Sequence, residues 1–190
     1  MKMRKVLSAL LVAACTLSLA ACGSSSSKNE TTGASGETAA GSANTAKVID
    51  VDLTSEEYAF GVDKTQPELL EQTNTFIQKI KDDGTLDAIC AKYFGDGEPE
   101  AVESAELDSS KDQLVVATNA AFEPFEYTKG DQYYGIDMEI AKLLADELGK
   151  ELVIQNMDFD AVCLSVSQQK CDIAMAGLTI NEERQEYVTF

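Results

Sequence analysis

LVVATNAAFEPFEY (residues 114–127) and CDIAMAGLTINEER (residues 171–184) each open on a short apolar run and then become polar. Apolar runs of this length are typical of strands that are buried on both faces of a sheet. A third run, ELVIQN at residues 151–156, lies between them, and a helical pattern separates each pair of runs. Strands that alternate with helices predict an α/β fold with a central, mostly parallel sheet that is flanked by helices.

Two helices are expected inside this unit. The first has a plausible N-cap at Asp137 and ends at Gly149, with an apolar stripe between them. The second is shorter and would be capped by Asp160, and its inward-facing residues are Val162, Cys163 and Val166.

Residues 67–94 predict a further pair of helices. The first ends at Gly84 and carries an apolar stripe formed by Leu69, Thr73, Phe76, Ile77 and Ile80. Thr85 would cap the second helix, whose inward-facing residues are expected to be Leu86, Ile89, Tyr93 and Phe94.

Residues suited to binding a carboxylate follow the last apolar run. Open α/β sheets bind small ligands at the ends of their strands. Arg184 presents a planar fork of donors that matches a carboxylate and stays charged at any relevant pH. Gly177 allows the backbone to approach a ligand closely, and the Thr179 hydroxyl adds a donor. The sequence therefore predicts recognition of a carboxylate rather than bond breaking.

The loops after the other two runs add an amide and aromatic rings. Asn119 follows the first run, and Phe122 and Phe159 offer ring faces to the non-polar part of a small solute. Taken singly, Arg184 would be a solvated helix residue and each phenylalanine a core residue. Only their joint placement at strand ends favours a binding site.

Four motifs of this region occur in the order of a known family. They are LVVATNAAFEPFEY (114–127), YGIDMEIA (134–141), MDFD (157–160) and AGLTINEER (176–184). Together they resemble the first half of a family 3 extracellular solute-binding protein, the amino-acid-binding component of an ABC importer. The resemblance implies a type II periplasmic-binding-protein-like fold, in which two α/β lobes close over an amino acid.

The resemblance also implies a role for each site residue. Arg184 would hold the α-carboxylate of the ligand with help from Thr179, and the Gly177 carbonyl would accept a hydrogen bond from the α-ammonium group. Two rings would flank the ligand and one amide would meet its side chain or amino group; these are Phe122, Phe159 and Asn119.

The order of the segments departs from that family. Residues 48–96, with YAFGVDK at 58–64, resemble the strand and two helices that end the family's chain. An acidic, exposed and irregular linker at 97–112 would join them to the first-lobe segment at 113–190. The resemblance thus implies one circularly permuted lobe over residues 48–190 with the second lobe missing. A single open lobe is expected to bind its ligand weakly.

The N-terminus combines basic residues, an apolar run and the tetrapeptide LAAC at residues 19–22. This pattern predicts a lipoprotein signal peptide over residues 1–21, lipidation of Cys22 and a flexible tether over residues 22–47. The expected location is the exported face of the plasma membrane, where a lipid anchor would hold the protein beside an ABC transporter permease. An uncleaved membrane anchor is the alternative.

The composition excludes several classes of function. The formal net charge is −18, and removal of the signal with Lys2, Arg4 and Lys5 would leave about −21. Such acidity disfavours nucleic acid and anionic lipid as partners. The chain contains no histidine, which excludes a Ser–His or Cys–His relay and a histidine metal site. No catalytic residue, metal site or cofactor is expected.

Three cysteines would remain after Cys15 leaves with the signal and Cys22 is lipidated. Cys90, Cys163 and Cys171 fall at apolar helix or strand positions, so we expect buried free thiols. A Cys163–Cys171 disulfide is the alternative.

Three functions are consistent with these observations. The first is an amino-acid receptor for an importer. The second is an enzyme on the same scaffold, similar to dehydratases or lytic transglycosylases, although no acid–base pair is evident. The third is an interaction module that binds no ligand.

Overall fold

The computed structural model describes residues 50–51 and 56–190. The predicted signal peptide (1–21), the lipidation site Cys22 and the predicted tether (22–47) lie outside the described residues.

The described chain contains eight strands, five α-helices and one short 3-10 helix. In chain order they are β1 (Tyr58–Asp63), α1 (Pro67–Asp82), α2 (Thr85–Phe94), β2 (Gln113–Thr118), β3 (Ala121–Phe122), β4 (Glu126–Lys129), β5 (Gln132–Tyr134), α3 (Ile136–Glu147), β6 (Glu151–Asn156), η1 (Phe159–Ala161), α4 (Val162–Ser167), β7 (Ile173–Thr179), α5 (Glu182–Tyr187) and β8 (Val188–Thr189). No helix of these residues is both long and apolar enough to cross a bilayer.

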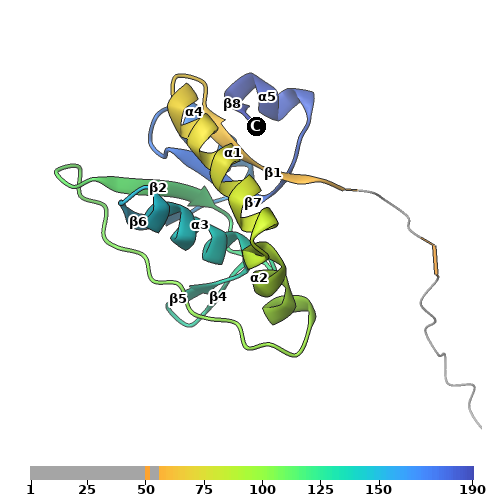
Figure 1. The fold of residues 1–190 in the computed structure, drawn as a ribbon. Helices are drawn as coiled ribbons and strands as arrows, with labels where there is room; N and C mark the ends of the chain where they lie inside the picture. The colour runs from red at the N-terminus through yellow and green to blue at the C-terminus, as the bar shows by residue number, and fades with distance from the viewer. Residues whose placement is uncertain (1–49, 52–55) are drawn as a thin grey trace, which may run out of the picture. The chain divides into compact units, whose positions relative to one another are not determined.

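The central sheet has the strand order β6-β2-β7-β1-β8 (Figure 1). β2 is parallel to β6 and β7, whereas β1 is antiparallel to both of its neighbours, β7 and β8. Four of the five strands therefore run in one direction, which confirms the predicted α/β fold with a mostly parallel sheet. The N-terminal segment contributes the strand that runs the other way, and it places Tyr58 opposite Thr179.

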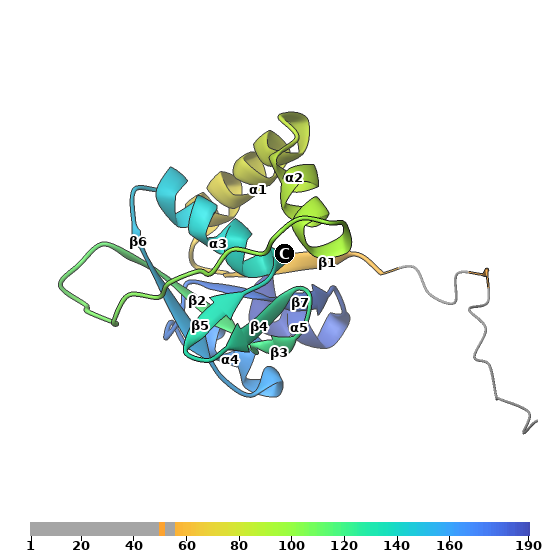
Figure 2. The ribbon, with the colours of Figure 1, turned by 90° about the horizontal axis from the view of Figure 1, so that it is seen from below.

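Helices cover both faces of this sheet. α1, α2 and α3 lie on one side and α4 lies on the other (Figure 2). Alternate residues of β2 serve the two cores: Leu114 and Val116 pack in the cluster with α1, α2 and α3, whereas Ala117 packs in the cluster with α4. This period of two is the pattern expected for a strand that is buried on both faces.

The segment after β2 forms more structure than the sequence predicted. Residues 119–127 were expected to be a loop, but β3, β4 and β5 form a separate three-stranded antiparallel sheet. β7 also continues to Thr179, so Gly177 and Thr179 lie within the strand rather than after it.

Three predicted helix caps are wrong. Gly135 and Gly84 occupy the N-cap positions of α3 and α2, so Asp137 and Thr85 lie inside the first turns. Asp160 lies within η1 and does not cap α4. The Asp137 side chain is buried, and its Oδ2 accepts a hydrogen bond from the Gly177 N–H at 2.9 Å. It therefore links α3 to β7.

Most of the predicted helical stripes are buried, but Phe94 is an exception. Leu69, Thr73, Phe76 and Ile80 are buried on α1, and Ile89 is buried on α2. Phe94 is the last residue of α2 and is 67% exposed, so the prediction that it faces inward is wrong.

The acidic segment between α2 and β2 is irregular but is not fully exposed. Val102 is buried and forms a backbone bridge to Tyr133 in β5. The Ala105 N–H donates to the Leu152 carbonyl, and the Ser104 hydroxyl accepts from the Ile154 N–H. The segment therefore covers the edge of β6. The prediction that the linker at residues 97–112 is exposed was wrong for these residues.

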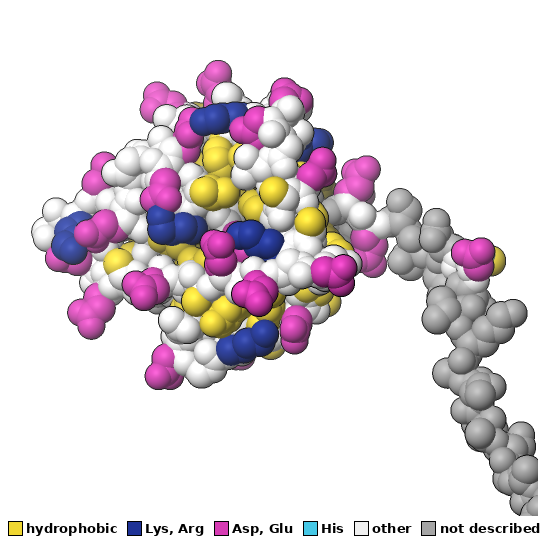
Figure 3. All heavy atoms as spheres, turned by 60° about the horizontal axis from the view of Figure 1, so that its bottom comes forward, with side chains coloured by type: hydrophobic (Ala, Val, Ile, Leu, Met, Phe, Trp, Pro, Cys, Tyr) yellow, Lys and Arg dark blue, Asp and Glu magenta, His cyan; other side chains and the backbone are white. Residues whose placement is uncertain are grey.

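The face shown in Figure 3 carries aspartates and glutamates among scattered lysines or arginines. On this face the acidic side chains do not gather into one patch.

Cys163 and Cys171 are buried free thiols, as expected, whereas Cys90 is free and half-buried.

Candidate ligand-binding site

A hollow of about 360 Å³ lies where β2 and β7 end. All six residues predicted to bind a ligand line it, together with residues that the sequence did not single out. Its lining is Glu56, Tyr58, Asn119, Ala121, Phe122, Glu126, Phe159, Ala176, Gly177, Thr179 and Arg184. The parallel strands β2, β6 and β7 bring these residues to one edge of the sheet.

Arg184 is held in place from two sides. Its backbone N–H donates to the side-chain oxygen of Asn181, the N-cap of α5, at 2.8 Å. Its Nη1 donates to the Thr179 carbonyl at 2.6 Å, and the guanidinium carbon lies 5.0 Å from the centre of the Phe159 ring. A guanidinium has five N–H donors, so one bond to Thr179 leaves it able to grip a carboxylate.

Aromatic rings form the apolar part of the lining. Phe122 and Phe159 are 43% and 40% exposed, which argues against the alternative that they are core residues. Phe122 stacks on Phe125 with ring centres 5.4 Å apart, and Tyr58 meets Phe125 edge-on at 4.8 Å. These contacts hold the exposed ring faces in position for a flat or aliphatic ligand group.

Gly177 occupies a position where a larger residue would be strained and would displace the Phe122 ring. Its φ is +53°, and a Cβ added there would lie 2.9 Å from the Phe122 ring. The missing side chain lets Phe122 lie directly over the strand, so Gly177 shapes the hollow as well as opening its backbone to a ligand.

Glu126 is the most unusual residue of the lining. It is 1% exposed, and neither carboxyl oxygen has a hydrogen-bond partner among the described residues. Burial and the nearby Asp137 raise the pKa of Glu126 to about 9. Burial also raises the pKa of Asp137 to about 6, although the hydrogen bond from Gly177 opposes this shift. An unpartnered buried carboxyl group in a hollow is suited to a cationic or hydrogen-bonding ligand group.

Asn119 is engaged with the protein. Its Nδ2 donates to the Met157 carbonyl at 2.7 Å, which ties the loop after β2 to the loop after β6. The amide therefore helps to hold the strand ends together, and its predicted contact with a ligand stays a prediction.

Four residues in or beside this site were not predicted from the sequence to belong to it: Glu56, Tyr58, Glu126 and Asp137. Tyr58 and Glu56 come from the N-terminal segment, and the Tyr58 hydroxyl donates to Glu56 at 3.0 Å. Asp137 was interpreted as a helix cap. A signal for Glu126 existed in its place between the aromatic residues Phe125 and Tyr127, which marks a partly apolar setting for a charged group.

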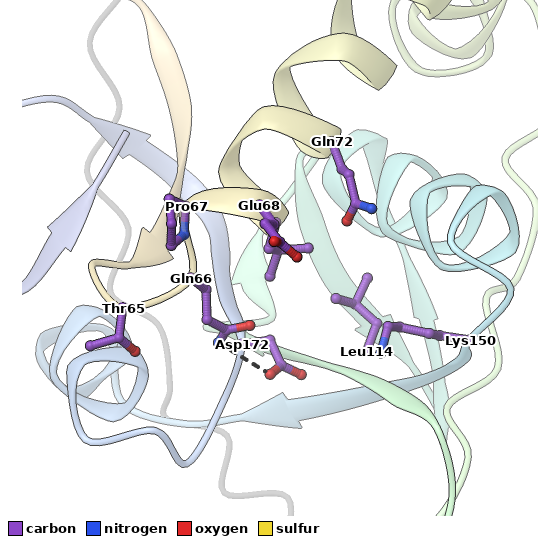
Figure 4. A pocket seen from close by; sticks show the side chains of 9 residues that line it. Thr65, Gln66, Pro67, Glu68, Gln72, Leu114, Lys150 and Asp172 are labelled. Atoms are coloured by element: carbon purple, nitrogen blue, oxygen red, sulfur yellow. Dashed lines mark hydrogen bonds between the residues drawn. The ribbon is translucent and has the colours of Figure 1, made fainter.

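A second hollow, of about 460 Å³, lies at the start of α1 (Figure 4). Its lining includes Gln66, Leu114 and Asp172, and Asp172 already accepts hydrogen bonds from the Val115 N–H and from Gln66. Leu114 lies near the beginning of β2, so this hollow is at the opposite end of the strand from Asn119. Gln66, Asp172 and Lys150 already have partners, and we assign this hollow no ligand.

Part of this chain is similar in sequence to known proteins. The sequence profile of bacterial extracellular solute-binding proteins, family 3, matches residues 114–190. Residues 114–190 are thus similar to that family. The match begins in β2 and ends with the chain, so it contains all six predicted site residues as well as Glu126 and Asp137.

Relatives of this family-3 segment include binding proteins and an enzyme. The arginine-binding extracellular protein ArtP of Bacillus subtilis is 37% identical over 83 residues, which cover 44% of this chain and 32% of the relative. The cyclohexadienyl dehydratase of Pseudomonas aeruginosa is 37% identical over 78 residues, which cover 40% of this chain and 29% of that enzyme. The chain thus spans about a third of the length of the curated relatives that it matches.

A solved structure also has a similar sequence. The arginine-bound form of domain 1 from TmArgBP is 37% identical, with a TM-score of 0.38, and the match covers 43% of this chain and 67% of that one.

Proposed function

We propose that this protein binds a cationic amino acid, with arginine as the first ligand to test, and delivers it to an ABC importer. The observation that carries the proposal is Glu126, a buried and unpartnered carboxyl group in the same hollow as Arg184. The hollow therefore offers a fixed cation, Arg184, and a buried acid, Glu126. An amino acid with a positive side chain has a carboxylate for the first and a cation for the second.

The rest of the lining supports an amino acid of this kind. Phe122 and Phe159 provide ring faces for an aliphatic chain, and a guanidinium or ammonium group is attracted to aromatic rings. The Gly177 carbonyl would accept from the α-ammonium group. Several relatives of the family segment are named as arginine-binding proteins, which supports arginine as the first ligand to test.

Further parts of the proposal concern the whole molecule. Residues 48–96 would take the place of the family's C-terminal segment, and the insertion of β1 between β7 and β8 supports this circular permutation. We also propose that the protein is exported, that a lipid on Cys22 attaches it to the membrane, and that it binds the permease of an ABC transporter. A second lobe would complete the binding site. The family's extracellular location supports them.

Titration calorimetry of the purified chain with arginine tests the proposal. We expect saturable binding, with lysine and ornithine weaker or equal and glutamate absent. Arg184→Ala should weaken binding by about 10- to 100-fold, because a charge-assisted hydrogen bond contributes about 1.5–3 kcal/mol. Lys81→Ala, an exposed change on α1, is the control and should bind as the unchanged protein does. Unchanged affinity in Arg184→Ala would refute the carboxylate role.

A second candidate is catalysis on the same scaffold. Glu126 is a neutral acid at pH 7, and such groups serve as proton donors to leaving groups. The dehydratase among the relatives favours testing this activity. Incubation with a cyclohexadienyl acid, followed by absorbance of an aromatic product, should show turnover that Glu126→Gln removes. If the protein shows no turnover and binds no amino acid, the third hypothesis, an interaction module that binds no ligand, is favoured.

A further inference from the structure

Two buried carboxyl groups meet at Gly177. The Gly177 N–H lies 2.9 Å from Asp137 Oδ2, and a Cβ built on the same residue would lie 3.6 Å from Glu126 Oε1. Asp137 is 4% exposed and Glu126 is 1% exposed. Two acids this close in a desolvated setting do not both ionise readily, because each charge disfavours the other.

The surroundings decide which acid holds the proton. Asp137 accepts the Gly177 N–H and lies in the first turn of α3, where the helix dipole favours a negative charge. Glu126 has no hydrogen-bond partner among the described residues, so nothing there replaces the water that an ionised carboxylate requires. Asp137 is therefore the carboxylate and Glu126 the neutral acid at pH 7.

The other charged and titratable groups around Glu126 do not remove this proton. Tyr58 of β1 stays neutral, since burial and its hydrogen bond to Glu56 raise its pKa. Glu56 also lines the hollow, and it brings no positive charge that would draw the proton from Glu126. Arg184 of α5 is the cation of the lining, and its guanidinium is directed to the Thr179 carbonyl and the Phe159 ring.

We propose that a cationic ligand enters this site in exchange for the proton of Glu126, with Asp137 as the fixed negative charge that holds the proton there until the ligand arrives. The inference rests on the proposed function and specifies how its site works. The cation of the ligand replaces the proton as the partner of Glu126, the O–H bond breaks, and the proton passes to the buffer. The net charge of the occupied site is then the same as that of the empty one.

This exchange makes affinity depend on pH. Because the empty site must lose a proton to accept the cation, the dissociation constant of arginine should fall about tenfold when the pH rises from 6.5 to 7.5. The guanidinium of arginine stays charged throughout this range, so the ligand's side chain contributes nothing to the change. A neutral ligand such as glutamine leaves Glu126 protonated and should show no such dependence.

Calorimetry in phosphate and in Tris at pH 7.0 measures the exchange directly. These buffers differ in ionisation enthalpy, so the difference in observed heat counts the protons that arginine releases; we expect about one. Glu126→Gln should release none with its residual binding, whereas Glu123→Gln, an exposed change three residues away, should still release about one. If Glu126→Gln binds too weakly to measure, the pH series of the unchanged protein decides.

The outcomes separate the two proposals. Arginine binding without proton release, or with an affinity that is flat between pH 6.5 and 7.5, would overturn the exchange and leave the receptor function standing. No binding of arginine, lysine or ornithine at any pH would overturn the receptor function and the exchange with it.

Discussion

Replacing Glu126 by glutamine should stabilise the ligand-free protein. The pKa of Glu126 is about 9 in the fold against an ordinary value of 4.5. Between these pH values the folded protein binds a proton that the unfolded chain does not, so the free energy of unfolding decreases as the pH rises. Glutamine is neutral in both states and removes this dependence.

The magnitude follows from the same two values. A pH of 7 lies about 2.5 units above the ordinary pKa of 4.5, which corresponds to at most about 3.5 kcal/mol at about 1.4 kcal/mol per unit. A domain of this size gains about 2–4 °C in melting temperature per kcal/mol, so we expect a rise of about 7–14 °C at pH 7. The gain should fall below about 0.5 kcal/mol at pH 4.5, where the unfolded carboxyl group is half protonated.

Urea unfolding followed by circular dichroism at pH 4.5, 6, 7 and 8 provides the assay. The difference between Glu126→Gln and the unchanged protein should increase with pH. Glu123→Gln is the same substitution at an exposed position and should change the free energy of unfolding by less than about 0.5 kcal/mol at every pH. A difference that is independent of pH, or a loss of stability at pH 7, would refute the reasoning.

Two further changes test the packing of the site and of the core. Gly177→Ala should lower the stability by about 1–3 kcal/mol and weaken ligand binding, because the added Cβ would lie 2.9 Å from the Phe122 ring. The control is Gly130→Ala, at a glycine with a similar positive φ and open space around it. This change should lower the stability by about 1 kcal/mol and leave binding unchanged. Cys163 and Cys171 should resist alkylation in the folded protein at pH 8 and react when it is unfolded, since burial raises the pKa of both thiols; mass spectrometry before and after urea measures this, and rapid labelling of the native protein would contradict it.

The position of the site could be predicted from the sequence because it depends on topology. Asn119, Phe159 and Thr179 lie at or just past the ends of β2, β6 and β7, and parallel strands bring their carboxyl ends to one edge. Local apolar runs define these strands, so no distant contact had to be known. Arg184 follows Thr179 by five residues, and its Nη1 donates a hydrogen bond to the Thr179 carbonyl.

The acid of the site could not be predicted in the same way. Glu126 is one of 33 acidic residues, and Glu123 in the same loop is exposed. What buries Glu126 is the small sheet of β3, β4 and β5, whose strands are only two to four residues long and too short to give a clear periodic pattern. The place of Tyr58 in the site could not be predicted, because its pairing partner Thr179 is distant in the sequence.

Phe94 shows the limit of helical periodicity. Its spacing from Ile89 and Tyr93 placed it on the inner stripe, but α2 ends at this residue. Its ring instead meets Phe125 edge-on, with ring centres 6.2 Å apart. A stripe predicts burial only as far as the helix has a neighbour to pack against.

The position of β1 between β7 and β8 has a consequence for how the chain folds. Tyr58 and Thr179 pair across about 120 residues of sequence, and β8, which pairs with the other side of β1, follows later still. Contacts between such distant segments are slow to form, because a long loop must close before they stabilise anything. During synthesis α1 and α2 emerge long before the strands that cover them, so they have no sheet to pack against. The domain should therefore fold late and as one cooperative unit, and a chain that stops short of β7 should be left unfolded.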